Sequence, residues 1–511
     1  MTKNLRVKSS EYIDETNRIS FKFNGKTYHG FKGDTLASAL LANDVHLVGR
    51  SFKYHRPRGI MTSGSEEPNA IVQVNPGTNR TEPNVRATEV EIYEGLEASS
   101  QNCWPSVEFD IGGINNFLSP FFPAGFYYKT FMWPASFWKK YEFFIRHSAG
   151  LGKSPTSSDP DIYDHRNIHC DVLVVGAGIS GILAAKNAAK NNFKTLLVDE
   201  KNELGGSTIF ENNEFNKIDN KTPSEWLKKE IEELKNIKNL EIKTRTSVAA
   251  YHQYNYLLAR ENLTDHLEAK DKTNKIRQRL LKIRAKKVIL ATGALERPLI
   301  FNNNDRPGIM LSSAVKKYSE FYGVACGSKN VFFTNNDSAY ETAMSLYNKG
   351  INVEAIIDNN IEFDCIYGPA YKGIFLGSIV ATVFSEQGKN YPVSFNRKEA
   401  KDHGEGGNII GANPSGNVLI IDDVLSAGTA GRESINSIIN HNATPSSFVV
   451  GLDRQEKGVS DESASKELEN EFNMNVTSIV NLDSLIAYVS NESELTEYLE
   501  GLNNYRETWG A

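Results

Sequence analysis

The sequence predicts an α/β protein of several domains, with a β-rich domain at its N-terminus. A chain of 511 residues is long enough for about two to four domains. Residues 19–31 alternate apolar and polar side chains around Asn24-Gly25, which is a strong hairpin signal. An apolar strand, a glycine-containing turn and a helical segment follow Asp171, and a similar pattern recurs after about Asn360. These two strand–turn–helix patterns are typical of two α/β units that follow the β-rich part.

Composition and charge exclude several classes of protein. The chain is 40% apolar and 23% charged, unlike disordered or collagen-like sequences. Its net charge of −6 argues against a broad nucleic-acid-binding surface, so the basic stretch 270–287 is expected to form strands with a solvated face. Four cysteines without a CxxC pair predict neither a protein-held metal nor an iron–sulfur centre, and they fit a reducing, cytoplasmic location.

The most apolar stretch of the chain is an aromatic segment, Phe117–Trp138. Pro120, Pro123, Lys129 and Pro134 interrupt it, so it cannot form an unbroken membrane-spanning helix. We expect this segment to dock between layers of the fold. We expect no membrane anchor and no membrane partner.

Changes of pattern along the chain predict four parts. Residues 1–100 form the β-rich domain, and residues 101–168 form a connecting segment rich in proline and aromatic residues. Residues 169–358 hold the first α/β unit, and residues 359–511 hold the second. No tandem repeat or low-complexity linker separates these parts.

A glycine-rich turn predicts a dinucleotide site in the first α/β unit. Gly176, Gly178 and Gly181 form a GxGxxG motif between an apolar strand and a helix. The first glycine permits the tight turn, the second lets the backbone approach a pyrophosphate, and the third lets the helix pack closely on the strand. Asp199 closes the next strand, where an acid can bind ribose hydroxyls, and the adjacent Glu200 could serve instead. The cofactor is expected to be NAD or FAD.

Two further turns are expected where the chain returns to this cofactor. They are the turn that ends at Gly206 and the turn at Thr292-Gly293. The plainer interpretation of both is an ordinary turn at the end of a strand.

An acidic pair followed by a small-residue loop predicts a phosphate site in the second unit. Asp422 and Asp423 end an apolar strand, where their carboxylates can accept hydrogen bonds from ribose hydroxyls. The loop that follows can hold a 5′-phosphate with its backbone N–H groups at the start of a helix. The alternative is a plain strand-to-helix turn with a capping acid. The loop residues are Ser426, Ala427, Gly428, Thr429 and Ala430.

A polar, glycine-containing loop lies between these motifs. Its cationic candidates are Arg397, Lys398, Lys401 and His403, and the glycines behind them can act as a hinge. Such a loop can close over a substrate and direct cations to a leaving pyrophosphate. The alternative is a solvated charged turn.

The front of the chain, to about residue 355, resembles the alpha subunit of heterotetrameric sarcosine oxidase. The matching segments are GRSFKYHRPRG (49–59), AGFYYKTFMWP (124–134), IRHSAGLG (145–152), CDVLVVGAGISG (170–181), ATGALERP (291–298) and TNNDSAYETA (334–343). The resemblance implies N-methylglycine oxidation in a complex with other subunits, with NAD bound by this subunit and flavin near the subunit interface. It also implies a ferredoxin-like fold for the β-rich domain. Because no cysteine precedes Cys103, we expect that domain to hold no cluster and to be structural.

Residues 361–511 resemble orotate phosphoribosyltransferase, which implies a type I phosphoribosyltransferase fold. The matching segments are FDCIYGPAYKGI (363–374), SFNRKEAKDHGEGGN (394–408), VLIIDDVLSAGTAGRES (418–434) and GLDRQEKG (451–458). The resemblance implies transfer of phosphoribosyl from phosphoribosyl pyrophosphate (PRPP) to orotate, with magnesium chelated by the substrate phosphates and with a homodimer as the active form.

The same resemblance assigns roles to individual residues. Lys401 and His403 lie nearest the chemistry, together with the acidic pair. Tyr371 and Lys372 contact the diphosphate, whereas Ser426 and Arg454 hold orotate. Val424 and Leu425 belong to the same substrate-binding motif as the small-residue loop.

Both resemblances are incomplete, and they meet at about residues 355–361. The folate-binding domain of the oxidase is not found behind the first match, and the front segment of the transferase is not found ahead of Ile361. Because the join falls inside a folded unit of each family, we expect a recombined or misassembled reading frame rather than a selected bifunctional enzyme. Transferase activity is the leading prediction. The alternatives are an oxidoreductase subunit with an inactive C-terminal remnant and a catalytically silent nucleotide-binding protein.

Overall fold

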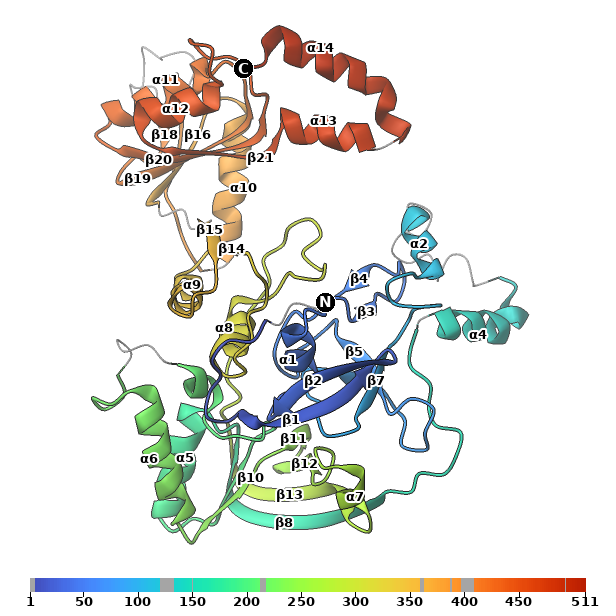
Figure 1. Ribbon diagram of the computed structural model, residues 1–511. Helices are drawn as coiled ribbons and strands as arrows, with labels where there is room; N and C mark the ends of the chain where they lie inside the picture. The colour runs from blue at the N-terminus through green and yellow to red at the C-terminus, as the bar shows by residue number, and fades with distance from the viewer. Residues whose placement is uncertain are drawn as a thin grey trace. The chain divides into compact units, whose positions relative to one another are not determined.

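The computed structural model shows two compact units, Met1–Asp358 and Asn359–Ala511 (Figure 1). The described residues are 5–119, 133–148, 150–211, 217–358, 363–386, 388–396, 409–491 and 493–511.

The N-terminal domain is built on a five-stranded sheet of order β2-β1-β7-β5-β6. Its first two strands form the predicted hairpin, in which Asn24 and Gly25 have φ of 50° and 76°. Helix α1 (Leu36–Ala42) starts with a capping box at Thr35 and packs into the core. The strands are β1 (Asp14–Phe23), β2 (Lys26–Lys32), β5 (Ile71–Val74), β6 (Glu82–Arg86) and β7 (Glu97–Ser100), beside a short ribbon of β3 (Gly49–Arg50) and β4 (Pro57–Arg58).

A distant helix completes the core of this domain. Helix α8 (Ser312–Glu320) places Ala314 and Tyr318 in the same buried cluster as Phe21 and Leu40. The Tyr318 hydroxyl donates a hydrogen bond to the Thr62 carbonyl over 2.9 Å. The N-terminal domain is therefore packed against the α/β part of its unit rather than tethered to it.

The aromatic segment was expected to dock between layers, and that expectation is wrong for its described residues. Phe117 and Trp133 are each 83% exposed, and Trp138 is 51% exposed. Residues 120–132 lie outside the described part of the chain. The short elements here are η1 (Ile111–Gly113), α2 (Ile114–Phe117), η3 (Ala135–Phe137) and α4 (Trp138–Ser148).

The first α/β unit holds a six-stranded sheet of order β10-β9-β8-β13-β12-β11. Strands β10, β9, β8 and β13 are parallel, and β12 and β11 continue the sheet as an antiparallel meander. The basic stretch 270–287 contains the start of β13, as its pattern predicts. The elements are β8 (Ile162–Val175), α5 (Ile179–Lys190), β9 (Thr195–Val198), η4 (Gly206–Phe210), α6 (Pro223–Lys235), β10 (Leu240–Lys243), β11 (Thr246–His252), β12 (Tyr256–Asn262), α7 (Ala269–Lys272) and β13 (Ile276–Leu290).

The last part of this unit is a strand–helix–strand segment that forms only a two-stranded parallel sheet. It comprises β14 (Asn330–Thr334), α9 (Ser338–Asn348) and β15 (Val353–Asp358). Phe333 and Ile357 remain 43% and 52% exposed. This strand–helix–strand segment thus ends as a partly uncovered pair of strands.

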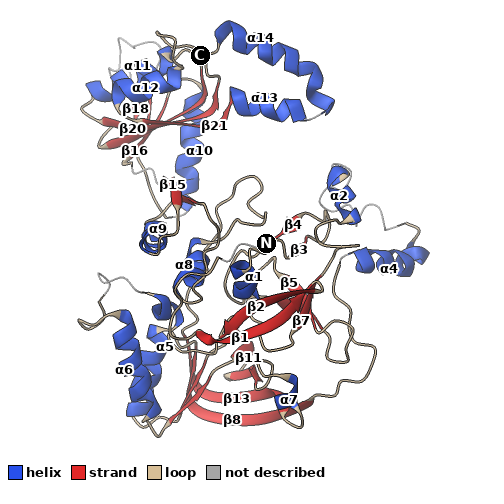
Figure 2. Ribbon diagram, viewed as in Figure 1, coloured by secondary structure: helices blue, strands red, loops and turns tan. Residues whose placement is uncertain are grey.

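The second unit has a six-stranded sheet of order β18-β17-β16-β19-β20-β21, parallel except for β18. Alternate residues of β19 face opposite sides, because Val418 and Ile420 join one buried cluster while Leu419 and Ile421 join another. Helices α11 and α12 cover one face and α10 the other (Figure 2). The elements are β16 (Cys365–Gly368), α10 (Lys372–Glu386), β17 (Val393–Asn396), β18 (Ile409–Gly411), β19 (Asn417–Leu425), α11 (Thr429–Asn440), β20 (Thr444–Asp453), α12 (Ala464–Phe472), β21 (Asn475–Asn481), α13 (Leu482–Asn491), η5 (Ser493–Tyr498) and α14 (Leu499–Trp509).

Candidate functional sites

The glycine turn of the first unit has the geometry of a ligand-binding turn. Gly176 has φ of 97°, and a Cβ there would lie 2.2 Å from the Ala291 carbonyl oxygen. A Cβ at Gly181 would lie 1.8 Å from the Gly176 oxygen, so the helix can approach the strand only through a glycine. A Cβ at Gly178, in contrast, would meet no atom within 4 Å. The middle glycine therefore faces open space, where a pyrophosphate can approach the start of α5.

The two other predicted turns meet at this position. A Cβ on Gly206 would lie 3.1 Å from the Gly178 Cα, and the Gly205 N–H donates to the Ala177 carbonyl over 2.8 Å. The Thr292 nitrogen would lie 3.2 Å from a Cβ at Gly176. Two separate segments thus contact the glycine turn, at the carboxyl end of β8.

The two acids at the end of β9 have different surroundings. Asp199 accepts hydrogen bonds from the Ala177 and Lys201 N–H groups over 2.6 and 2.8 Å, and burial raises the pKa of its carboxyl group. Glu200 accepts from the Ser65 hydroxyl and pairs with Lys201. Burial acts to raise the pKa of Glu200, but the charge of Lys201 and the hydrogen bonds from Lys201 and Ser65 together outweigh it, so the net pKa is lowered. Asp199 therefore stabilises the glycine turn through its hydrogen bond from Ala177, and Glu200 is an ionised acid beside that turn.

In the second unit the predicted phosphate loop joins β19 to α11. Gly428 has φ of 83° and precedes the first residue of the helix, whose N-terminus has no side-chain cap. A side chain at this left-handed position would be strained. The other four loop residues, Ser426, Ala427, Thr429 and Ala430, are exposed. No side-chain cap therefore uses the backbone N–H groups at this helix start, and such groups can hold an anion.

The acidic pair and Lys372 form one electrostatic group. The Lys372 Nζ lies 2.6 Å from the Asp423 Oδ2. Burial raises the pKa of Asp422 to about 6, and the charge of Asp423 adds to this effect. Burial acts to raise the pKa of Asp423 as well, but the hydrogen bond and the charge of Lys372, with the hydrogen bonds to Asp422 and the backbone, together outweigh it, so the net pKa is lowered. One acid is thus held ionised while its neighbour titrates near neutrality.

Three neighbouring strands bring the other predicted residues to this edge of the sheet. Tyr371 and Lys372 follow β16, and Tyr371 is 65% exposed. Arg454 follows β20, where it contacts the Tyr505 hydroxyl over 3.4 Å and Glu456 over 3.5 Å. Because β16, β19 and β20 are parallel, their carboxyl ends lie at one edge of the sheet, where α/β proteins bind ligands.

Val424 and Leu425, which were predicted to bind substrate, lie in the sheet and the core, and Gly373 is a further residue that shapes the site. Leu425 is buried in the core at 2% exposure, and Val424 pairs with Leu452 in the sheet. Gly373 had no assigned function, but a Cβ there would lie 2.7 Å from the Ile421 carbonyl oxygen. Because Gly373 has no side chain, the first turn of α10 can approach β19 closely, and this approach places Lys372 beside the acids. Its position in GPAYKGI was the only available sequence signal.

Part of the predicted transferase site lies outside the described residues. Arg397, Lys398, Lys401 and His403 all fall in residues 397–408. Within the described ranges, no group of three or more His, Cys, Asp or Glu side chains could hold a metal ion. Across those same ranges, no helix is long and apolar enough to cross a membrane.

Two family profiles match the front of the chain. The family described as 2Fe-2S iron-sulfur cluster binding domain matches residues 16–103. The family described as Pyridine nucleotide-disulphide oxidoreductase matches residues 170–337. The first unit therefore contains a Fer2-type domain and a nucleotide-binding domain of the pyridine nucleotide oxidoreductase type.

Curated relatives of the front part are sarcosine oxidase alpha subunits. The subunit of Rhizobium meliloti is 47% identical over 355 residues, which are 69% of this chain and 36% of the relative. That of a Corynebacterium species is 36% identical over 348 residues, covering 68% of this chain and 31% of the relative. This chain thus spans about a third of the length of these relatives.

Relatives of the C-terminal part are orotate phosphoribosyltransferases. The enzyme of Neisseria meningitidis serogroup C is 42% identical over 201 residues, which are 39% of this chain and 94% of the relative. A crystal structure of the Francisella tularensis enzyme is 35% identical and covers 30% of this chain and 72% of that chain, with a TM-score of 0.25.

The two sets of matches overlap along the chain. Their shares of this chain, 69% and 39%, together exceed its length, so a stretch ahead of Asn359 aligns with both families. In the structure, those residues fold with the first unit. Because the second alignment covers 94% of the Neisseria relative, the expectation that no front segment of the transferase precedes Ile361 is wrong for the sequence. Both sets of relatives are enzymes, and the chain is a fusion of the two kinds of sequence. Its N-terminal part is similar to sarcosine oxidase subunit alpha, and through its C-terminal part the chain belongs to the orotate phosphoribosyltransferase family.

Proposed function

We propose that the C-terminal unit transfers a phosphoribosyl group from PRPP to orotate, giving orotidine 5′-phosphate and pyrophosphate. The observation behind this proposal is the acidic pair at the end of β19, next to Lys372 and to a helix start without a side-chain cap. In the reaction, the bond from ribose C1 to the pyrophosphate oxygen breaks, and a bond from C1 to a ring nitrogen of orotate forms.

Each group at this edge has a distinct task in the proposal. The Asp422 and Asp423 carboxylates accept hydrogen bonds from the ribose hydroxyls, and the loop of residues 426–430 holds the 5′-phosphate through its N–H groups. Tyr371 and Lys372 contact the diphosphate, so Lys372 exchanges its ion pair with Asp423 for one with the substrate. Ser426 and Arg454 hold orotate, with the guanidinium on the carboxylate.

The proposal places magnesium and the loop cations on the leaving group. Magnesium would arrive bound to the PRPP phosphates, because Mg²⁺ usually takes most of its oxygen ligands from substrate phosphates and water. Arg397, Lys398, Lys401 and His403 stabilise the charge that develops on pyrophosphate as the glycosidic bond breaks.

The test is consumption of orotate by the purified full chain. We expect consumption that depends on PRPP and on magnesium, and that Asp423→Asn abolishes while Gly178→Val does not. Absence of turnover in a folded protein that still binds PRPP would favour the silent nucleotide-binding alternative. Ligand-induced shifts of the melting temperature distinguish these cases.

We propose that the active form is a homodimer in which the loop of one subunit serves the site of the other. A mixture of Lys401→Ala and Arg454→Ala variants tests this arrangement. In a dimer with shared sites, the two inactive proteins recover activity when they are mixed. Absence of recovery from a demonstrated mixed dimer would contradict it.

For the first unit we propose a bound dinucleotide, NAD or FAD, at the glycine turn, and an N-terminal domain that holds no iron–sulfur cluster. Cys103 is the only cysteine within matched residues 16–103, whereas a [2Fe–2S] cluster needs four protein ligands. N-methylglycine oxidation and association with other oxidase subunits remain secondary proposals. Purified chain should retain NAD or a yellow flavin, and should show no iron.

We propose that the join arose by recombination or misassembly of a reading frame rather than by selection for two activities. The exposed Phe333 and Ile357 on a two-stranded sheet support this proposal. Continuous long-read DNA and a matching transcript across codons 345–370 would refute misassembly. A cytoplasmic location stays a prediction from cysteine usage.

A further inference from the structure

Unsatisfied polar groups are concentrated on one loop of the first unit. Among the described residues, four buried side-chain N or O atoms have no hydrogen-bond partner, and three of them belong to residues 262–266. They are Asn262 Oδ1, Thr264 Oγ1 and His266 Nδ1. Thr264 is only 4% exposed. Because buried polar atoms are nearly always paired in native proteins, this loop requires a partner that the chain itself does not provide.

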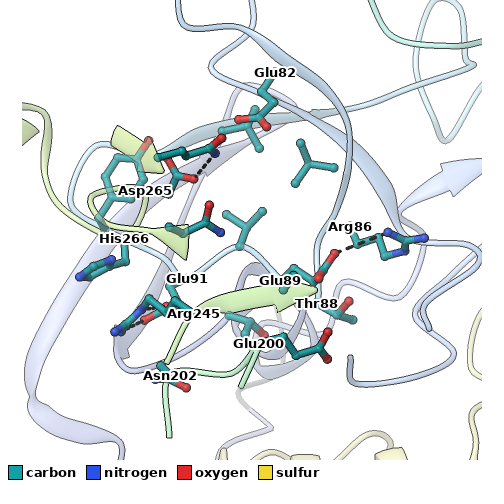
Figure 3. A pocket seen from close by; sticks show the side chains of 18 of the residues that line it. Glu82, Arg86, Thr88, Glu89, Glu91, Glu200, Asn202, Arg245, Asp265 and His266 are labelled. Atoms are coloured by element: carbon teal, nitrogen blue, oxygen red, sulfur yellow. Dashed lines mark hydrogen bonds and ion pairs between the residues drawn. The ribbon is translucent and has the colours of Figure 1, made fainter. Parts of the chain in front are cut away.

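Asn262, Asp265 and His266 of this loop line one wall of a chamber of about 410 Å³, whereas Thr264 does not line it. The N-terminal domain supplies the opposite wall, including Glu82, Thr88 and Glu91, and Asp265 and His266 project from the loop (Figure 3). The volume is within the range of small-molecule sites. The chamber lies between two packed domains of one unit, where ligand sites commonly occur.

The chamber is distinct from the glycine turn. None of the glycines at positions 176, 178, 181, 206 and 293 lines it, and neither does Thr292. Glu200, Lys201 and Asn202 form one end of it, so the two sites adjoin at the end of β9. A ligand can therefore occupy the chamber without occupying the pyrophosphate position.

Two arginines of the chamber, Arg277 and Arg245, have carboxylate partners from different elements. Arg277 contacts Glu82, Asp161 at 3.2 Å and Asp265 at 2.6 Å. Arg245 binds both carboxylate oxygens of Glu91 over 2.6 and 2.8 Å, as Figure 3 shows. These ion pairs join the N-terminal domain to the six-stranded sheet of the same unit. The carboxylates compensate the positive charges of Arg245 and Arg277.

Two lysines of the chamber differ from these arginines. The Lys272 Nζ donates to the Asp265 backbone carbonyl over 3.1 Å and lies 4.0 Å from the Tyr93 ring centroid. The Lys317 Nζ donates to the Ser63 carbonyl over 3.3 Å. Neither ammonium group has a carboxylate within ion-pair distance among the described residues. Burial lowers the pKa of each lysine to about 8, and the charges of the nearby acids do not offset this effect.

We propose that this chamber is a second ligand site of the N-terminal unit, which binds a small organic anion. Its carboxylate or phosphate pairs with Lys272, and its hydroxyl or amide groups hydrogen-bond with the side chains of Asn262 and His266. Occupancy would give the Lys272 ammonium group an anionic partner and would give Asn262 Oδ1 and His266 Nδ1 hydrogen-bond partners. The ligand contacts both domains, so its binding would also stabilise their contact.

Residue-resolved lysine acetylation of the full chain tests the site. A succinimidyl ester modifies Lys272, and mass spectrometry follows its rate with inorganic phosphate in one arm and glycolate in the other. The exposed Lys275, three residues away, is the internal control. At ten times its Kd, the bound anion should slow modification of Lys272 about tenfold by mass action and leave Lys275 unchanged. Slowing by phosphate alone or by glycolate alone identifies the anionic group.

Variants separate this site from the others. Protection of Lys272 should persist in Gly178→Val and in Asp423→Asn, and loss of protection in either would assign the anion to a dinucleotide or phosphoribosyl site. Asn262→Leu removes an unpartnered oxygen that lines the chamber at similar side-chain volume, so it should reduce the shift of melting temperature that the anion induces. Equal rates with and without either anion, or an undiminished shift in Asn262→Leu, would show a water-filled domain interface and overturn the proposal.

Discussion

The Nζ of Lys372 lies 2.6 Å from the Oδ2 of Asp423, and this contact joins the first residue of α10 to the end of β19. The lysine side chain is 75% exposed, whereas that of Asp423 is 30% exposed. An ion pair this open contributes little to folding stability. We therefore expect the lysine to act in ligand binding, where a polyanionic substrate can replace Asp423 as the partner of its ammonium group.

Replacing Lys372 should weaken PRPP binding without unfolding the unit. Lys372→Met removes one charge-assisted contact to the diphosphate. We expect this loss to raise the KM for PRPP about tenfold or more. The melting temperature should change little, because the pair is exposed. Lys389→Met, an exposed lysine behind α10, is the matched control. Steady-state kinetics with varied PRPP measure the effect, and an unchanged KM would contradict the role of Lys372.

The raised pKa of Asp422 predicts a pH dependence of transfer. Its carboxyl group, with a pKa of about 6, is protonated at pH 5 and ionised at pH 7. Because the ionised form accepts hydrogen bonds from ribose hydroxyls, kcat/KM for PRPP should rise across this range. Asp422→Asn stays neutral at every pH and should lack that rise. A pH profile shared by both proteins would assign the titration to another group.

The same group has the opposite effect on folding stability. Its pKa is higher in the fold than in the unfolded chain, so folding favours the protonated form. The contribution of Asp422 is present below its ordinary pKa and is lost as the pH rises through about 6. Denaturant unfolding at pH 4 and pH 7 should show a smaller difference for Asp422→Asn than for the native sequence. An equal difference for both would be evidence against this prediction.

Two glycines of the dinucleotide turn should respond differently to substitution. Gly178 has φ of −72° and open space around its missing Cβ, so Gly178→Val should preserve folding while blocking the dinucleotide. At Gly181 a Cβ would lie 1.8 Å from a carbonyl oxygen, so Gly181→Ala should destabilise the unit by about 1–3 kcal/mol. Thermal unfolding and retention of NAD or flavin measure the two effects. Transfer of phosphoribosyl should survive Gly178→Val; if it is lost together with the dinucleotide, the two-site description fails.

Tyr318 should be essential for the N-terminal domain although it lies on α8. It is fully buried, and Tyr318→Ala should cost about 3–5 kcal/mol by analogy with other large aromatic truncations. Tyr318→Phe retains the ring and should lose only the hydrogen bond to Thr62, about 1 kcal/mol. Chemical denaturation followed by hydrogen exchange in β1 and α1 measures these losses. Unchanged protection in Tyr318→Ala would show that α8 is not part of this core.

Local patterns predicted much of the fold. The hairpin at Asn24-Gly25 and the strand–glycine turn–helix at Gly176 are short-range features, because each depends on a backbone conformation or a periodicity that neighbouring residues specify. The same is true of the helix start after Gly428. The roles of the site residues remain predictions, and those on residues 397–408 lie outside the described structure.

By itself, the sequence determined that two different strand-to-helix turns with glycines occur in one chain, one after Val175 and one after Ile421. Only the tertiary structure decided that α8 completes a core formed some 270 residues earlier, that Asp199 bonds to the Ala177 N–H, and that Lys372 pairs with Asp423. The chamber beside residues 262–266 likewise exists only because two domains pack together. The physical reason is that such contacts depend on which faces of distant elements are buried against one another, and residue spacing along the chain does not specify those pairings.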